Sequence, residues 1–177
     1  MERSKEFLIT VIETAKRLDF DHLLRIIRKG SHPHVWKAAK KKIDLHDLGV
    51  TELFELGTAM TSFLTDDEGQ KDLDLIWIIA GEKMDLDDLI EKLNKNEKIP
   101  EVVVATVLKK YRFEDMRTYQ LVKILETYDD SQGWETVSYK LEKGHAFSTD
   151  TLISIILANF DRDRFRLCQR ALDRLQH

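Results

Sequence analysis

The chain contains few of the residues that interrupt regular secondary structure. Among its 177 residues there are seven glycines and two prolines. All-β folds need many tight turns, and those turns depend largely on glycine, proline and small polar residues. This scarcity disfavours an all-β fold and indicates helices that are joined by polar loops.

Cysteine is almost absent, since Cys168 is the only one. A single thiol excludes an internal disulfide framework and a zinc site of the CxxC type. Because disulfide frameworks are typical of oxidising compartments, the sequence predicts a reducing, intracellular location.

Long apolar runs are also missing. Stretches such as residues 75–80 and 152–157 are far shorter than the roughly 20 residues of a membrane-spanning helix, so no membrane partner is expected. Acidic residues outnumber basic ones by 32 to 28, which gives a net charge of −4. This balance argues against a protein that depends on non-specific phosphate binding.

The dominant positive signal is a helical pattern of apolar residues. Phe7, Leu8, Val11 and Ile12 recur at spacings of three and four residues, and this periodicity continues along almost the whole chain. The sequence therefore predicts an all-α protein with about eleven helices. Their expected ranges are 4–17, 21–29, 33–43, 50–63, 69–81, 85–95, 100–111, 114–127, 132–143, 149–159 and 162–176.

Similar segments recur along the chain, as residues 18–24 do in residues 84–90. The leucines that anchor the first helix of each unit lie about 30 to 36 residues apart, the length of one helix pair. Because one pair cannot cover its own apolar face, we expect antiparallel pairs to stack into an α-solenoid, a single domain over residues 1–177. A non-repetitive helical bundle is the alternative. The anchors are Leu23, Leu53, Leu89, Leu121 and Leu152.

Residues 147–160 carry the most specific family resemblance. With helices such as 119–125 and 133–137, they resemble the octotricopeptide, heptatricopeptide and FAST-kinase-type repeats of organelle RNA-metabolism proteins. This resemblance implies a right-handed stack of helix pairs that binds RNA or belongs to a mitochondrial assembly. HEAT-like repeats match almost equally well. Residues 69–160 are also similar to CARD-like death-fold domains, which implies a signalling adaptor.

The sequence offers no convincing catalytic or metal site. His32 and His34 flank Pro33, and His46 follows, but a zinc site needs three or four ligands that converge. Cys168 lies in an apolar stripe, where cysteine behaves as a small hydrophobe. Motifs of the GxGxxG, Walker and GxSxG types are missing. We therefore expect no enzyme activity, no cofactor, no metal and no small-molecule substrate.

Charge is distributed unevenly along the chain. Between Asp21 and Asp44 there are seven basic residues and no acid, whereas residues 66–101 carry twelve acids and five lysines. The predicted basic patch consists of Arg25, Arg28, Lys29, Lys37, Lys40 and Lys41. A second basic ridge is formed by Arg162, Arg166 and Arg170 at helical spacing. The predicted acidic patch consists of Asp85, Asp87, Asp88 and Glu91.

These charges are compatible with solvated surface, with docking of a protein partner or with phosphate binding. Trp36, Trp77 and Trp134 fall in apolar stripes, so they are expected in the core rather than as stacking platforms for RNA bases. The preferred prediction is a non-enzymatic scaffold that binds protein partners within a larger assembly. An RNA-binding repeat protein is the first alternative, and a CARD-like adaptor is the second.

The apolar stripes also predict which side chains form the core. The residues expected to be largely buried are Trp36, Ala39, Leu89, Ala105, Leu121, Trp134, Leu152, Cys168 and Leu172.

Overall fold

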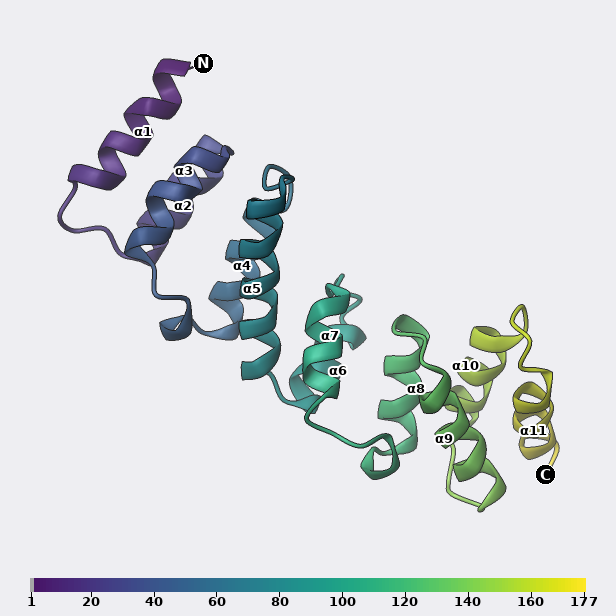
Figure 1. The fold of residues 1–177 in the computed structure, drawn as a ribbon. Helices are drawn as coiled ribbons and strands as arrows, with labels where there is room; N and C mark the ends of the chain where they lie inside the picture. The colour runs from purple at the N-terminus through teal and green to yellow at the C-terminus, as the bar shows by residue number, and fades with distance from the viewer. Residues whose placement is uncertain (1) are drawn as a thin grey trace. The chain divides into compact units, whose positions relative to one another are not determined.

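The computed structural model describes residues 2–177, and these residues form eleven α-helices and no strand (Figure 1). Three single-turn 3-10 helices, η1 (Lys40–Lys42), η2 (Leu45–Asp47) and η3 (Phe113–Asp115), lie between them. The α-helices are α1 (Glu2–Thr14), α2 (Phe20–Gly30), α3 (Pro33–Ala39), α4 (Val50–Met60), α5 (Asp67–Lys83), α6 (Leu86–Asn94), α7 (Glu101–Leu108), α8 (Thr118–Thr127), α9 (Ser131–Glu142), α10 (Thr149–Asn159) and α11 (Phe165–Gln176).

This architecture confirms the predicted all-α class and the predicted number of helices. The largest differences in the bounds arise where a 3-10 turn replaces an α-helical end. The predicted helix over residues 33–43 ends at Ala39 and continues as η1, and the helix predicted from residue 114 begins at Thr118, after η3. Within the described chain, no helix is both long and apolar enough to cross a membrane.

Short polar side chains fix where several helices begin. Asp66, Asp130 and Ser148 each accept a hydrogen bond from the backbone N–H three residues further on. Such N-caps satisfy amide groups that have no partner inside the helix. The cap and the apolar stripe that follows it are both local in sequence, which explains why the helix starts could be predicted.

The chain divides into two compact units, Met1–Asp85 and Leu86–His177, and most contacts between residues lie within one unit or the other. In the first unit, α1 packs against α3 and α2, α2 packs against α3 and α4, and α4 packs against α5. Gly57 lies inside α4 because its missing side chain leaves room for Trp77 of α5, whose ring would approach an added Cβ to 2.5 Å. The fully buried residues of this unit include Ile12, Ile27, Val35, Leu53 and Ile76.

In the second unit, α6 packs against α7 and α8, and α8 packs against α9 and α10. The last helix, α11, packs against α10 and α9. The prediction of one continuous domain over residues 1–177 stays a prediction. Fully or almost fully buried residues of this unit include Leu89, Val103, Leu121, Trp134 and Ile155.

One local arrangement occurs in both units. A 3-10 turn precedes a helix pair, as η2 precedes α4 and α5 and as η3 precedes α8 and α9. In the first unit, Lys83 Nζ of α5 donates to the carbonyl oxygens of His46 and Leu48 at this turn. In the second, Lys140 Nζ of α9 donates to the carbonyl oxygen of Glu114 at 2.8 Å. In both units a lysine of the second helix of the pair thus contacts the turn that precedes the pair.

The core predictions are confirmed for six residues: Trp36, Ala39, Leu89, Leu121, Trp134 and Leu152 are buried. Ala105 and Cys168 are only half-buried.

The prediction is wrong for Leu172, which is 40% exposed, because α11 turns a different face inward and buries Leu167 and Ala171. In this orientation the guanidinium of Arg174 donates to the carbonyl oxygens of Leu141 at 3.1 Å and His145 at 2.9 Å.

Candidate docking surfaces

Most of the predicted basic patch is exposed and has no acidic partner. Arg25, Arg28 and Lys29 are exposed on α2, Lys37 is exposed on α3 and Lys41 is exposed on η1. None of the five has a carboxylate within 4.0 Å in the described part of the chain. Their charges are therefore available to a partner.

Lys40 differs from the other members of the patch. Its Nζ lies 3.0 Å from Asp72 Oδ2 and 3.8 Å from Glu68 Oε1, both on α5. The same Asp72 oxygen accepts a hydrogen bond from Trp36 Nε1 at 2.9 Å. Lys40 thus belongs to a polar network that ties α3 to α5.

A groove between α1 and α2 adjoins the basic patch. It consists of two cavities of about 870 and about 440 Å³ that share Leu8 and Lys29 in their walls. The larger cavity is lined by Arg3, Ser4, Lys5, Phe7, Leu8, Lys29, Gly30, Ser31 and His32. The smaller one is lined by Leu8, Leu18, His22, Arg25, Ile26 and Lys29. We call these two cavities the α1–α2 groove.

The charged residues that line the α1–α2 groove are all basic. Its apolar surface comes from Phe7, Leu8, Leu18 and Ile26, and Phe7 is 68% exposed. Arg3, Lys5, Arg25 and Lys29 supply cations, and no described residue in its lining is acidic. The sequence predictions include Arg25 and Lys29 but not the groove, because the stripe of α1 that contains Phe7 is expected in the core.

The histidines are not gathered into a ligand set. His32 Nδ1 accepts a hydrogen bond from the backbone N–H of His34 at 3.1 Å, and the two rings lie 5.0 Å apart. Partial burial and the nearby charges of Lys5 and His34 lower the pKa of His32. His46 lies in η2. Within residues 2–177 no three histidine, cysteine or acidic side chains are grouped so that they could hold a metal ion.

Cys168 is half-buried on α11, and its Sγ lies 3.8 Å from the carbonyl oxygen of Ile156. Burial raises the pKa of this thiol and outweighs a backbone hydrogen bond that acts in the opposite direction. A raised pKa keeps the thiol protonated at neutral pH, and the thiolate is the nucleophilic form. This environment does not activate Cys168.

The second basic ridge is largely occupied by contacts within the chain. Arg162 lies 2.7 Å from Asp129 Oδ1, and Arg170 contacts Ser138 Oγ and lies 3.8 Å from Glu142. Of its three residues, only the exposed Arg166 has no such contact in the described chain.

Asp129 is the centre of this cluster. It accepts hydrogen bonds from Trp134 Nε1 at 2.7 Å and from Arg164 at 2.9 Å, a residue outside the predicted ridge. Arg164 also lies 3.2 Å from Asn159 Oδ1 and 6.0 Å from the centre of the Trp134 ring. Burial opposes the charged carboxylate, but these hydrogen bonds and the charge of Arg162 hold the pKa of Asp129 below its ordinary value.

The acidic patch is exposed and partly engaged. Asp87, Asp88 and Glu91 lie on α6, and Asp85 precedes that helix. Asp87 Oδ1 accepts a hydrogen bond from Gln120 Nε2 of α8 at 3.3 Å. Glu91 pairs with Lys95 at 2.6 Å, and the hydrogen bond and charge of that lysine lower the pKa of Glu91. Asp87 therefore helps to join α6 to α8, and Glu91 helps to stabilise the end of α6.

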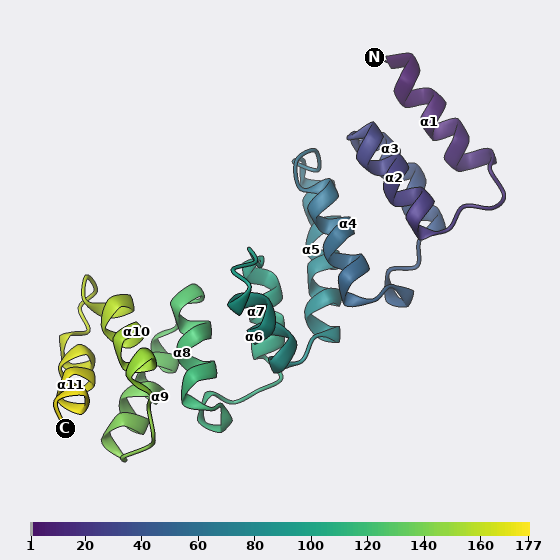
Figure 2. The same cartoon turned by 180° about the vertical axis from the view of Figure 1, so that it is seen from behind.

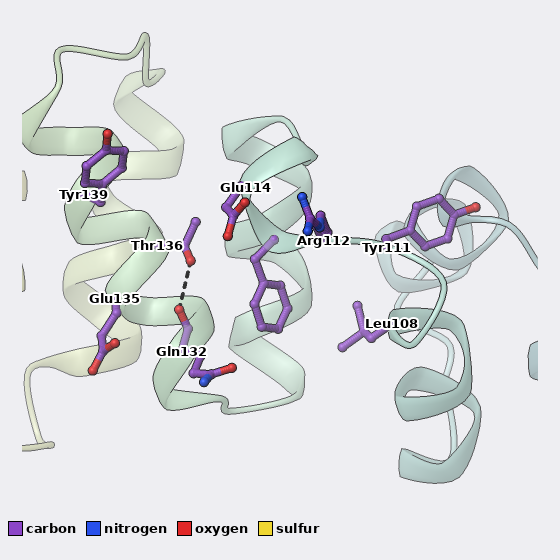
Figure 3. A pocket seen from close by; sticks show the side chains of 9 residues that line it. Leu108, Tyr111, Arg112, Glu114, Gln132, Glu135, Thr136 and Tyr139 are labelled. Carbon is purple, nitrogen blue, oxygen red and sulfur yellow. Dashed lines mark hydrogen bonds between the residues drawn. The ribbon is translucent and has the colours of Figure 1, made fainter.

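A pocket of about 840 Å³ in the second unit lies outside all predicted sites. Figure 3 shows Gln132, Glu135, Thr136 and Tyr139 on one side and Leu108, Tyr111 and Arg112 on the other, with Glu114 between them; Phe113 completes the lining. Tyr111 and Tyr139 are 37% and 57% exposed. The signal in the sequence is the segment 109–112, two lysines followed by tyrosine and arginine. Exposed aromatic rings beside cations can stack against nucleic-acid bases.

Comparison with protein-family models, with curated proteins and with solved structures finds no significant match to this chain. The choice among its surfaces therefore depends on the geometry alone. The α1–α2 groove combines apolar surface with available cations, whereas the ridge is largely engaged within the chain and the acidic patch is partly engaged.

Proposed function

We propose that this protein is a non-enzymatic helical scaffold that binds a protein partner through the α1–α2 groove, whose walls include Arg25 and Lys29 of the basic patch, as part of a larger assembly. The observation that carries this proposal is the composition of the groove. An apolar surface that is bordered by cations and by no described acid complements a protein segment that has apolar and acidic side chains. A phosphate backbone would use the cations and leave the apolar surface exposed to water.

The helix pairs support the scaffold role. We further propose that they stack as a right-handed α-solenoid. In support, α2 packs against α4 in one unit, and α6, α8 and α10 pack in succession in the other. In such stacks each pair contacts its neighbours, which leaves long surfaces for partners. The repeated lysine contacts of Lys83 and Lys140 support the same arrangement.

RNA binding is the second candidate function, and the pocket in Figure 3 favours it. Tyr111, Arg112 and Tyr139 could stack against bases, and Lys143 Nζ lies 5.6 Å from the centre of the Tyr139 ring. However, Glu114 and Glu135 line the same pocket and would repel phosphates. We therefore rank RNA binding below protein docking.

The two functions separate in a binding experiment with charge-reversal variants. The double variant Arg25→Glu/Lys29→Glu changes two cations of the groove. The matched control Arg28→Glu/Lys41→Glu changes one arginine and one lysine that are exposed but do not line it. Each immobilised protein is incubated with nuclease-treated extract from the native source, and retained proteins are identified by mass spectrometry.

We expect wild type and control to retain a common partner that the groove variant loses. Binding of labelled single-stranded RNA is measured in parallel at several salt concentrations. The protein-docking proposal fails if RNA binds tightly, with a slope of about −0.7 per phosphate contact in log affinity against log salt, and no protein depends on the groove.

A further inference from the structure

Helix α1 has no pairing partner among the described residues. The other ten α-helices form five consecutive contacting pairs, from α2 with α3 to α10 with α11. Helix α1 instead packs on α3, which is the second helix of the α2–α3 pair, and it also contacts α2 (Figure 1, Figure 2). Helix α9, the second helix of its own pair, packs on α11 in the same way. Helix α1 thus has the position of the second helix of a pair, and no described helix takes the position of the first helix of that pair.

The α1–α2 groove lies where a first helix would pack. On three first helices, the residue three positions after the anchor leucine is fully buried. These residues are Leu56, Ile124 and Ile155, which follow Leu53, Leu121 and Leu152 and are 0% exposed. Each is on a helix against which the preceding first helix packs, namely α2 on α4, α6 on α8 and α8 on α10, whereas no described first helix precedes α2.

The corresponding residue of α2 is Ile26, which follows the anchor Leu23 by the same interval. Ile26 is only half-buried, and it lines the groove. The position three residues after the anchor is thus fully buried on α4, α8 and α10 but partly exposed on α2.

The α2 wall of the groove has the periodicity of a helix-packing face. His22, Arg25, Ile26 and Lys29 lie at positions i, i+3, i+4 and i+7, so they share one side of α2 over about two turns. Such a face accepts an amphipathic helix whose apolar stripe meets the apolar residues. Cations on both walls of the groove favour acidic side chains at the borders of that stripe.

We infer that the α1–α2 groove binds an acidic amphipathic α-helix of the partner protein, which packs beside α1 in the position that the first helix of a pair would take. This inference rests on the proposed protein-docking function and specifies the chemistry of the partner. Apolar side chains of the incoming helix cover Phe7, Leu8 and Ile26. Its acidic side chains pair with the cations of α1 and α2.

A designed peptide tests the inference directly with the full chain. The probe is a fluorescein-labelled peptide of about 18 residues, about 27 Å long as a helix, with leucines on one face, glutamates beside them and alanines elsewhere. Three controls isolate its properties. In one, lysine replaces glutamate; in another, the same residues are scrambled so that no apolar face forms; in the third, a central proline interrupts the helix.

We expect saturable binding of the acidic peptide in fluorescence anisotropy, weaker binding at high salt and a gain of helical circular dichroism in the peptide. The three control peptides should bind at least about tenfold more weakly, as should the acidic peptide to Arg25→Glu/Lys29→Glu. Phe7→Ala, a change at an exposed position, should also weaken binding. The control Arg28→Glu/Lys41→Glu should change it by less than about twofold. Unfolding curves confirm that each variant remains folded.

The inference is overturned if the acidic helix does not bind, if the scrambled or proline peptide binds equally well, or if the groove variant binds like wild type. It is also overturned if single-stranded oligouridine, or vesicles of phosphatidylserine and phosphatidylcholine, compete for the groove better than the peptide does. If retention of an extract protein requires Arg25 and Lys29 but no helical peptide binds, the helix inference fails and the protein-docking function stands. Should neither bind, both fail.

Discussion

Two basic clusters that look alike in the sequence differ in the structure. On α2, Arg25 and Lys29 have no carboxylate within reach, whereas Arg162 and Arg164 both bind Asp129. The difference follows from the acids nearby. The segment between Asp21 and Asp44 contains none, but Asp129 precedes α9 and meets the residues that connect α10 to α11. A run of cations is available to a partner only where the adjoining helices offer no anion.

The largest effect on stability is expected in the packed interior of the second unit. Leu121 is fully buried on α8, so Leu121→Ala should lower the free energy of unfolding by about 2–5 kcal/mol. The matched change Leu157→Ala, at a side chain that is 64% exposed, should lower it by less than about 0.5 kcal/mol. Urea unfolding followed by circular dichroism measures both values, and equal losses would show that the assignment of the packed faces is wrong.

Removing the carboxylate of Asp129, which binds Arg162 and Arg164, should have the next largest effect on stability. Asp129→Ala deprives Trp134 Nε1 of its acceptor and leaves Arg164 without its carboxylate. We expect a loss of about 1 kcal/mol, because the carboxylate is 41% exposed and solvent screens its ion pairs. The comparison variant Arg25→Ala removes a cation without a partner and should leave the midpoint of urea unfolding unchanged. A similar loss for Arg25→Ala would contradict the difference between the two clusters.

The same cluster predicts a dependence of stability on pH. The pKa of Asp129 is lower in the folded protein than the ordinary value of 3.8, so folding favours its charged form. Its contribution is complete above the ordinary value and is lost as the pH falls through the folded pKa. Asp129→Asn should therefore lose less stability than wild type on acidification below about pH 4. Urea midpoints that run parallel for the two proteins over this range would exclude a depressed pKa.

The smallest effect distinguishes two neighbouring lysines of the basic patch. Lys40 pairs with Asp72, and both side chains are less than one third exposed. Lys40→Ala should lower the free energy of unfolding by about 0.5–1 kcal/mol, whereas Lys41→Ala, at an exposed residue, should have almost no effect. Thermal unfolding of the two variants at low salt gives the comparison, and at high salt the loss caused by Lys40→Ala should shrink. Identical curves would mean that Lys40 is as available as Lys41.

Local features of the sequence determined the helices. The caps at Asp66, Asp130 and Ser148 precede apolar stripes, and both signals act within one or two turns. For the same reason the anchors Leu89, Leu121 and Leu152 could be predicted as buried, and all three are; the anchors Leu23 and Leu53 are buried as well.

Only the tertiary structure decided which face of α11 is buried and which cations remain available. The stripe that contains Leu172 and the stripe that contains Leu167 are both compatible with a helix, and the packing of α11 on α10 and α9 buries the second. Likewise, Lys40 is engaged and Lys41 is not because Asp72, 32 residues away, lies beside only one of them. The α1–α2 groove arises in the same way, since it depends on α1 packing against α3 rather than on any motif. Periodicity specifies a helix and its possible faces, but the neighbours that helix meets in space determine which face is covered.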